Sequence, residues 1–192
     1  LLQNPCQKLM RLWKNTRTAE NRPRLVKKEF QYTIQEFSSS IDQDLLKQIY
    51  KLNQENTPEV GSLSSFEYLQ KIVKLSSNNF YVSFKESIIG FMICFRENSA
   101  YTSMNYDFFS KKEAKFLYID RIAIKSDYRR EGIGKNLYLL IEEITKAKNI
   151  PLCCEVNTLP LNQNSISFHE GLGFHRVGDY NFEDHSVAYF MK

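Results

Sequence analysis

The spacing of apolar and polar residues changes repeatedly along the chain, and each change predicts a different element. Apolar and polar side chains alternate in residues 27–37, which predicts a strand. Residues 43–53 instead place apolar side chains three and four positions apart, directly after Asp42, whose carboxylate can cap a helix. Ser65 precedes a second helical pattern in residues 66–76. The first part of the chain therefore predicts one strand followed by two helices.

Strongly apolar runs dominate the middle of the chain. Residues 79–84 and 88–95 have the composition of strands and are separated by a short polar turn, which predicts a hairpin. Residues 115–124 form another heavily apolar run and predict a central strand. The intervening residues 97–114 are expected to form a long loop, and long ordered loops often shape binding sites.

The C-terminal part alternates between helical and strand patterns. We expect a helix from Gly132 to about Lys148, a buried strand at residues 152–156, and then a helix and two final strands. This mixed order, without internal repeats, fits an α+β fold better than a doubly wound sheet. With 192 residues, 42% of them hydrophobic, the chain can bury one core of ordinary domain size.

Cysteine and histidine spacing favours packing roles over metal binding. The adjacent Cys153 and Cys154 lie in a predicted strand and should point to opposite faces. His175 and His185 are not spaced for a metal site, so we expect no metal. No apolar run approaches the ~20 residues that cross a bilayer. Cysteines with packing roles and no C-x-x-C spacing fit a reducing compartment, and we expect a cytoplasmic protein.

Positive charge is concentrated at the start of the chain. Residues 1–28 carry a net charge of +7, whereas the whole chain carries +4. The sequence therefore divides into a basic N-terminal extension at 1–27, a candidate amphipathic helix, and one domain at 28–192. The extension could dock on the domain or contact an anionic membrane or nucleic acid, although nucleic acid is not the expected partner. The protein could also pair with a second copy of itself as a homodimer.

The most specific chemical pattern follows the predicted central strand. Arg129, Arg130 and Lys135 surround two glycines, Gly132 and Gly134, where a strand passes through a turn into a helix. Unpaired backbone N–H groups and the helix dipole attract anions at such a turn, and glycine leaves room for the anion to approach. The pattern predicts a phosphate or pyrophosphate site.

Two nucleotide motifs are excluded at this turn. A Walker A loop that ends at Lys135 would need glycine in place of Arg129 and a hydroxyl residue in place of Asn136. A dinucleotide fingerprint that begins at Gly132 would need a small residue in place of Leu137.

Two motifs together carry a resemblance to a known family. The R-x-x-G-x-G pattern of residues 129–134 and the N-x-x-S-I-x-F-H-x-x-L-G-F pattern of residues 162–174 resemble the acetyl-CoA-binding blocks of the GCN5-related N-acetyltransferase (GNAT) superfamily, in particular a bacterial branch of it. The resemblance covers about residues 28–192. It implies a mixed, mostly antiparallel twisted sheet flanked by helices, with a splayed parallel strand pair that holds acyl-CoA. It also implies an acyl-CoA-dependent N-acyltransferase that moves acetyl to a primary amine by direct attack.

The resemblance places acetyl-CoA on particular residues of this chain. Main-chain groups of the central strand would pair with the pantetheine arm, the glycine turn would hold the pyrophosphate, and the second motif would contact the rest of the arm. The residues so assigned are Ile122, Ala123, Ile124, Arg129, Arg130, Glu131, Gly132, Ile133, Gly134, Lys135, Asn162, Ser165 and Phe168.

The resemblance also implies catalytic residues. Members of the superfamily often have a tyrosine at the position of His169, where it gives a proton to the leaving sulfur, so His169 is the predicted acid. Glu155 is the predicted base, because a lysine-like amine with a pKa of ~10.4 must lose a proton before it attacks. Asp120 is the rival base, unless Arg121 neutralises it, and Tyr118 is the next candidate acid.

The acceptor site is expected in the loops at residues 53–65 and 97–114. Acidic and aromatic side chains there could attract and pack against a cation: Glu55, Tyr101, Tyr106 and Asp107. This composition favours an amine of a small molecule or a peptide. The alternative function is a catalytically silent sensor or interaction module that binds CoA without turnover.

Overall fold

The computed structural model describes residues 30–192, and within this range the chain forms one mixed sheet flanked by helices. The sheet has the order β1-β2-β3-β4-β5-β7-β6. Its strands are β1 (Thr33–Phe37), β2 (Asn78–Phe84), β3 (Ser87–Arg96), β4 (Leu117–Ile124), β5 (Leu152–Leu159), β6 (His175–Asn181) and β7 (Ser186–Met191). Its helices are α2 (Gln43–Gln54), α3 (Phe66–Leu75), α4 (Met104–Lys112), α5 (Ile133–Lys148) and α6 (Gln163–Gly171). The predicted α+β fold with its mixed, mostly antiparallel sheet is confirmed. The predicted extension at residues 1–27 lies outside the described residues.

Local signals in the sequence set the helix boundaries. The Asp42 carboxylate accepts hydrogen bonds from two amides of the first turn of α2, and the Ser65 hydroxyl accepts one from Tyr68 in α3. Both predicted caps are therefore confirmed. The expectation that residues 97–114 form a loop is wrong, because they contain α4. Only two side chains of α4 are buried, and Ser103 makes no capping hydrogen bond, so the usual sequence signals of a helix are weak there.

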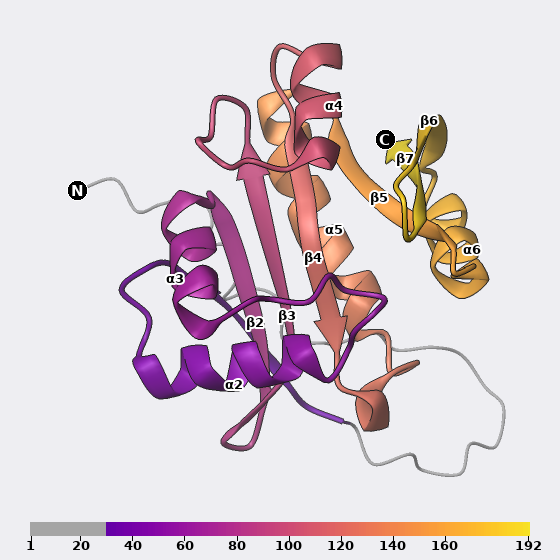
Figure 1. The fold of residues 1–192 in the computed structure, drawn as a ribbon. Helices are drawn as coiled ribbons and strands as arrows, with labels where there is room; N and C mark the ends of the chain where they lie inside the picture. Colours follow the sequence, from indigo (N-terminus) through magenta and orange to yellow (C-terminus); the bar gives the residue numbers. More distant parts are fainter. Residues whose placement is uncertain (1–29) are drawn as a thin grey trace, which may run out of the picture.

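The two faces of the sheet carry separate apolar cores. The first core is covered by α2, α3 and α4, whereas the second is covered by α5 and α6. Figure 1 shows α2 and α3 in front of the first strands and α5 behind β4. Cys153 packs in the first core and Cys154 in the second, so the prediction that these neighbours face opposite sides is confirmed.

The central strands separate at one end of the sheet. Strand β4 runs parallel to β5, but the two pair only at Leu117–Leu152, Tyr118–Cys153 and Ile119–Cys154. Beyond these pairs the two strands continue but no longer pair with each other, and Figure 1 shows β5 diverging from β4. This is the splayed parallel pair that the sequence resemblance implies.

A β-bulge lies at the point of separation. On its other side β4 pairs with β3, where Ile93 lies opposite Arg121 and Cys94 lies opposite Ile119, so Asp120 is the extra residue. A bulge of this kind turns two consecutive side chains toward one face and strengthens the local twist. The bulge therefore contributes both to the splay and to the side-chain arrangement described below.

Candidate active site

A cleft of about 530 Å³ occupies the space between the separated ends of β4 and β5. This volume lies within the range of small-molecule sites. Its walls come from the two strands, the loop between α2 and α3, the first turn of α4, helices α5 and α6, and the β6–β7 connection. Polar side chains on these walls include Glu59, Asn105, Asp120, Glu155, Tyr138, Asn162, Ser165, His169, Asp184 and His185.

The glycine turn that precedes α5 has the geometry of an anion site. Gly132 is the N-cap and has a φ of 81°, and a Cβ placed on it would meet no atom of residues 30–192 within 4 Å. No side chain from these residues caps the helix. Within residues 30–192 the amides of Gly132, Ile133, Gly134 and Lys135 donate to no protein acceptor. Four N–H groups at a helix start, next to open space, can bind a phosphate or pyrophosphate.

The open edge of β4 presents main-chain groups to the cleft. Lys125, directly after β4, donates its N–H to the Ile89 carbonyl of β3. Counting back from Lys125, every second residue of β4 therefore also turns its N–H and C=O groups toward β3. By this alternation Ile122 and Ile124 turn their N–H and C=O groups away from β3, to the side where β5 has already diverged. Ala123 is buried against β3 instead. The exposed groups can pair with an extended ligand as a further strand would.

Several residues assigned to the donor site have partners in the protein. Arg129 donates to the Ile124 carbonyl at 3.1 Å and to Asn56 Oδ1 at 2.6 Å, so it ties the glycine turn to the loop after α2. Arg130, Glu131 and Lys135 are exposed beside the same turn. The Asn162 side chain caps α6 by accepting from the Ser165 amide at 3.1 Å.

Phe168 and Gly134 connect the two motifs of the sequence. A Cβ on Gly134 would lie 3.8 Å from the Phe168 ring, so α5 and α6 approach each other here. The Phe168 ring also packs edge-on against Tyr138, with 5.3 Å between the ring centroids. The two motifs, distant in sequence, therefore border one region of the molecule.

Glu155 places a carboxyl group in the cleft. Its Oε2 is inaccessible to solvent and has no hydrogen-bond partner among residues 30–192. Burial, followed by the charge of Asp120, raises the pKa of Glu155 to about 8. The Tyr118 hydroxyl is also buried and has no hydrogen-bond partner in the part of the chain that the structure describes. Burial raises the pKa of Tyr118 well above its ordinary value, and the charge of Glu155 adds to that rise.

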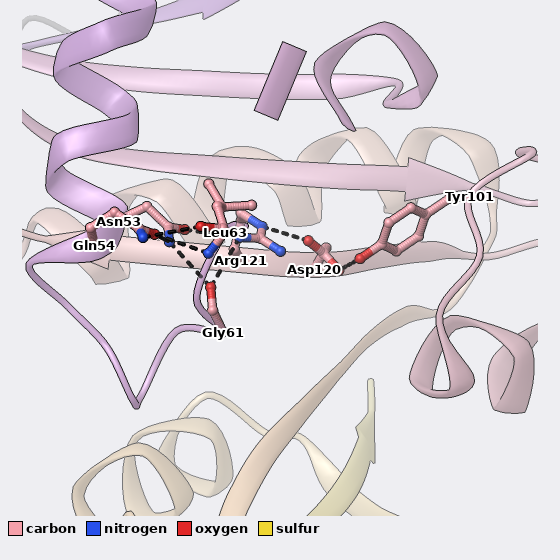
Figure 2. A network of polar contacts seen from close by, with 7 residues as sticks. All are labelled: Asn53, Gln54, Gly61, Leu63, Tyr101, Asp120 and Arg121. Atoms are coloured by element: carbon pink, nitrogen blue, oxygen red, sulfur yellow. Dashed lines mark hydrogen bonds and ion pairs between the residues drawn. The ribbon is translucent and has the colours of Figure 1, made fainter. Parts of the chain in front are cut away.

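Asp120, the rival base, is held by other side chains. Its Oδ2 accepts from Arg121 Nε at 2.7 Å and its Oδ1 accepts from the Tyr101 hydroxyl at 2.7 Å (Figure 2). The side chains of Asp120 and Arg121 are only 5% and 8% exposed. Both carboxylate oxygens of Asp120 thus have a partner, one of them a buried charge, whereas Glu155 Oε2 has none among the described residues.

Arg121 extends this network to the loop that borders the cleft. Its Nη1 donates to Asn53 Oδ1 at 2.9 Å and to the Gly61 carbonyl at 3.3 Å, and Asn53 donates to the same carbonyl (Figure 2). Gln54 exchanges two further hydrogen bonds with the main chain of Leu63. The loop between α2 and α3 is therefore fixed to the bulge of β4.

His169 is buried and both of its ring nitrogens are engaged. Nδ1 lies 2.7 Å from the Ser165 carbonyl oxygen, which can only accept, so Nδ1 carries a hydrogen. Nε2 lies 2.6 Å from the Tyr138 hydroxyl. In the neutral imidazole Nε2 accepts, and Tyr138 is the donor. Burial lowers the pKa of His169 and so favours the neutral form, while the hydrogen bond to the Ser165 carbonyl opposes this shift.

The four residues predicted for the acceptor do not line the cleft. Glu55 is exposed near Lys51, and Asp107 is exposed in an ion pair with Lys111. Tyr106 is a core residue whose hydroxyl donates to the Arg96 carbonyl. Tyr101 stacks on Phe95 and reaches the site only through Asp120. These last three residues border a separate surface depression, apart from the cleft.

Sequence reasoning missed several residues that line the cleft. Asn105 enters from α4, which the sequence did not reveal, and accepts a hydrogen bond from Tyr189 at 3.0 Å. Tyr138 lies a little more than one helical turn after the glycine turn, and this spacing was the one sequence signal that it lies near the site. His185 lines the cleft beside Asp184, whose carboxylate pairs with its Nδ1 at 2.7 Å.

In residues 30–192 no helix is long and apolar enough to cross a membrane. In the same range no three His, Cys, Asp or Glu side chains are grouped as metal ligands.

Several solved structures share this fold. The ribosomal-protein-S18-alanine N-acetyltransferase of Escherichia coli aligns with a TM-score of 0.59 and 20% identity, over 84% of this chain and 92% of that one. Arabidopsis thaliana NAA60 in complex with acetyl-CoA aligns with a TM-score of 0.61 and 19% identity, over 84% and 98% of the two chains. Arabidopsis thaliana Naa50 in complex with the bisubstrate analogue CoA-Ac-MVNAL gives 0.61 and 18%, over 83% and 97%. At these identities the likeness establishes the fold.

The family itself is established by sequence. The model of the acetyltransferase (GNAT) family matches residues 46–174, which is most of the chain and includes the glycine turn, Glu155 and His169. The chain therefore belongs to the acetyltransferase (GNAT) family.

Proposed function

We propose that this protein transfers an acetyl group from acetyl-CoA to a primary amine of a small molecule or peptide, by direct attack of the amine on the thioester. One observation carries the proposal: the carboxyl group of Glu155, with its free buried oxygen, lies in the cleft where β4 and β5 separate. Helix α5 lines the same cleft at Tyr138 and begins in the anion site at Gly132. A carboxyl base in the cleft, and a phosphate site at the start of a helix that lines the cleft, fit an amine and a CoA thioester.

The residues of this chain fit acetyl-CoA at three points. The free amides from Gly132 to Lys135 would hold the pyrophosphate, and the exposed Arg130 and Lys135 would add positive charge. Main-chain groups of Ile122 and Ile124 would pair with the amides of the pantetheine arm. Arg129 would fix the shape of the turn through its bonds to Ile124 and Asn56.

Glu155 is the group that would prepare the amine. An amine of pKa ~10.4 is protonated at neutral pH and cannot attack until it loses a proton. A base works best when its pKa lies near the operating pH, and the raised pKa of Glu155, about 8, meets this condition. Glu155 would accept the proton directly or through one water molecule.

The charge of the cleft supports a cationic acceptor. Glu59 and Asp184 lie on its wall with Glu155, and Arg121, the basic side chain among them, is already paired with Asp120. The structurally similar NAA60 and Naa50 were solved with bisubstrate analogues, and that of Naa50 carries the peptide MVNAL. Peptides with a free N-terminus therefore belong in an acceptor screen beside small amines.

A broad acceptor screen tests this function. The protein is incubated with acetyl-CoA and a panel of polyamines, amino sugars, lysine-containing peptides and peptides with free N-termini. We expect thiol release and a mass increase of one acetyl group for at least one class, and both should disappear in Glu155→Gln. Acetyl-CoA binding without thiol release under any amine would instead favour the catalytically silent CoA-binding module.

A further inference from the structure

The wall of the cleft formed by α5 and α6 holds one hydroxyl group whose hydrogen is shared with an imidazole. Tyr138 and His169 both line the cleft, and they are joined by the 2.6 Å contact between the phenol oxygen and Nε2. The second imidazole nitrogen is turned toward the Ser165 main chain. His169 thus has no ring N–H available to a ligand in the cleft, whereas the Tyr138 hydroxyl can turn about its C–O bond.

We infer that Tyr138, rather than His169, gives the proton to the departing thiolate, and that His169 Nε2 accepts the phenol hydrogen only until the thiolate forms. This inference rests on the proposed acetyl transfer. The family resemblance assigns the acid to His169 on α6. The inference assigns it instead to the phenol of Tyr138 on the neighbouring helix α5.

The proton transfers in this step balance. The amine nitrogen bonds to the acyl carbon, the carbon–sulfur bond breaks, and its electron pair goes to sulfur. A thiolate is a charged and therefore stronger acceptor than a neutral imidazole, so the Tyr138 hydroxyl turns from Nε2 to the sulfur and gives it the proton. The phenolate regains a proton, through water, from the nitrogen that becomes the amide. The proton that Glu155 took from the ammonium group returns to solvent.

The surroundings of the two groups favour this order. Burial raises the pKa of Tyr138 well above its ordinary value, so the phenol remains protonated when Glu155 has lost its proton. Burial lowers the pKa of His169, so an imidazolium would already be lost at that pH. The ionisable groups around the Tyr138 hydroxyl come from β3, β5 and α6: Cys94, Cys154, Glu155 and His169.

The thiol of bound coenzyme A tests this inference without an acceptor. A hydrogen bond from Tyr138 to the sulfur stabilises the thiolate, so the protein is saturated with coenzyme A and the thiolate is titrated by its ultraviolet absorbance. Tyr138→Phe removes only the hydroxyl and should lower the ionisation constant of the bound thiol about 10- to 100-fold, with coenzyme A affinity nearly unchanged. Tyr81→Phe is the matched control, because its hydroxyl bonds to Gln35 away from the cleft, and it should change nothing.

His169→Asn separates the two candidate donors. The asparagine amide can still donate to the Ser165 carbonyl but has no group in place of Nε2, so the Tyr138 hydroxyl is free to face the sulfur. We expect the thiol to ionise as readily as in the wild type, or more readily. Weaker thiol ionisation in His169→Asn would overturn the inference, and so would unchanged ionisation in Tyr138→Phe. If Tyr138→Phe does not fold, the result for His169→Asn still tests the inference. Failure of the wild type to bind coenzyme A would overturn the proposed function, and the inference with it.

Discussion

Asp120 and Arg121 are consecutive residues of strand β4, yet their side chains lie on one face of the sheet and form an ion pair of 2.7 Å between Oδ2 and Nε. A regular strand would turn them to opposite faces. The bulge at Asp120 brings them together and leaves Arg121 in reach of Asn53 and Gly61. The same irregularity therefore contributes to the separation of β4 and β5, fixes the bordering loop and places the Asp120 carboxylate where its charge raises the pKa of Glu155.

Removal of Arg121 should destabilise the fold strongly. Arg121→Met leaves the Asp120 carboxylate buried without its charge partner, and such changes typically cost about 3–5 kcal/mol of unfolding free energy. Urea denaturation measures the loss. The double variant Arg121→Met with Asp120→Leu should recover most of it, because no unpaired charge then remains. Arg176→Met, which breaks an exposed pair with Asp179, serves as the control and should cost no more than about 1 kcal/mol.

Glu155→Gln should stabilise the protein at alkaline pH. The pKa of Glu155 is raised from 4.5 to about 8, so between these values the unfolded chain loses a proton that the folded protein keeps. The wild type therefore loses stability as pH rises through this window and loses no more above it. We expect the free energy of unfolding of Glu155→Gln to exceed that of the wild type by roughly 2–4 kcal/mol at about pH 9, and to differ little from it near pH 4. Equal stabilities at both pH values would contradict the raised pKa.

Gly132→Ala should weaken the donor site. Gly132 has a φ of 81°, a conformation that costs a residue with a Cβ about 1–2 kcal/mol. The added methyl group would also occupy the open space beside the free amides. Calorimetric titration should show weaker coenzyme A binding together with a lower melting temperature. Gly171→Ala in α6 is the control, because no atom lies within 4 Å of the added Cβ and φ is not in the left-handed region, so binding should not change.

Arg129→Ala should lower the affinity for coenzyme A about 10- to 100-fold, because a charged hydrogen-bonding group beside the glycine turn is lost. Asn56→Ala keeps this charge but removes the partner that holds the guanidinium at 2.6 Å. A smaller loss in Asn56→Ala would assign the main effect to charge, whereas equal losses would assign it to the shape of the turn. Unchanged affinity in a folded Arg129→Ala protein would contradict the assigned donor site.

The sequence predicted the features that depend on local patterns. Asp42 and Ser65 were identified as caps because capping depends on residue type and position, and the helix after Gly132 was predicted by its apolar spacing. Helix α4 was missed because its pattern is weak, and Asn105 was missed with it. The common face of Asp120 and Arg121 depends on a bulge, and the contact of Tyr138 with His169 depends on the packing of two helices. Neither is encoded in a periodicity that can be read along one segment.

The most direct test of the whole account is the pH dependence of acetyl transfer to an accepted amine, measured at saturating acetyl-CoA in the wild type and in Glu155→Gln. If Glu155 is the base in the cleft, the wild-type rate rises as pH increases through about 8, where its carboxyl group loses the proton. The rate should then stay high, because the Tyr138 phenol remains protonated there, and Glu155→Gln should be slower by a factor of about 10²–10⁴. A Glu155→Gln protein that transfers acetyl at the wild-type rate, with the same pH profile, would contradict the account.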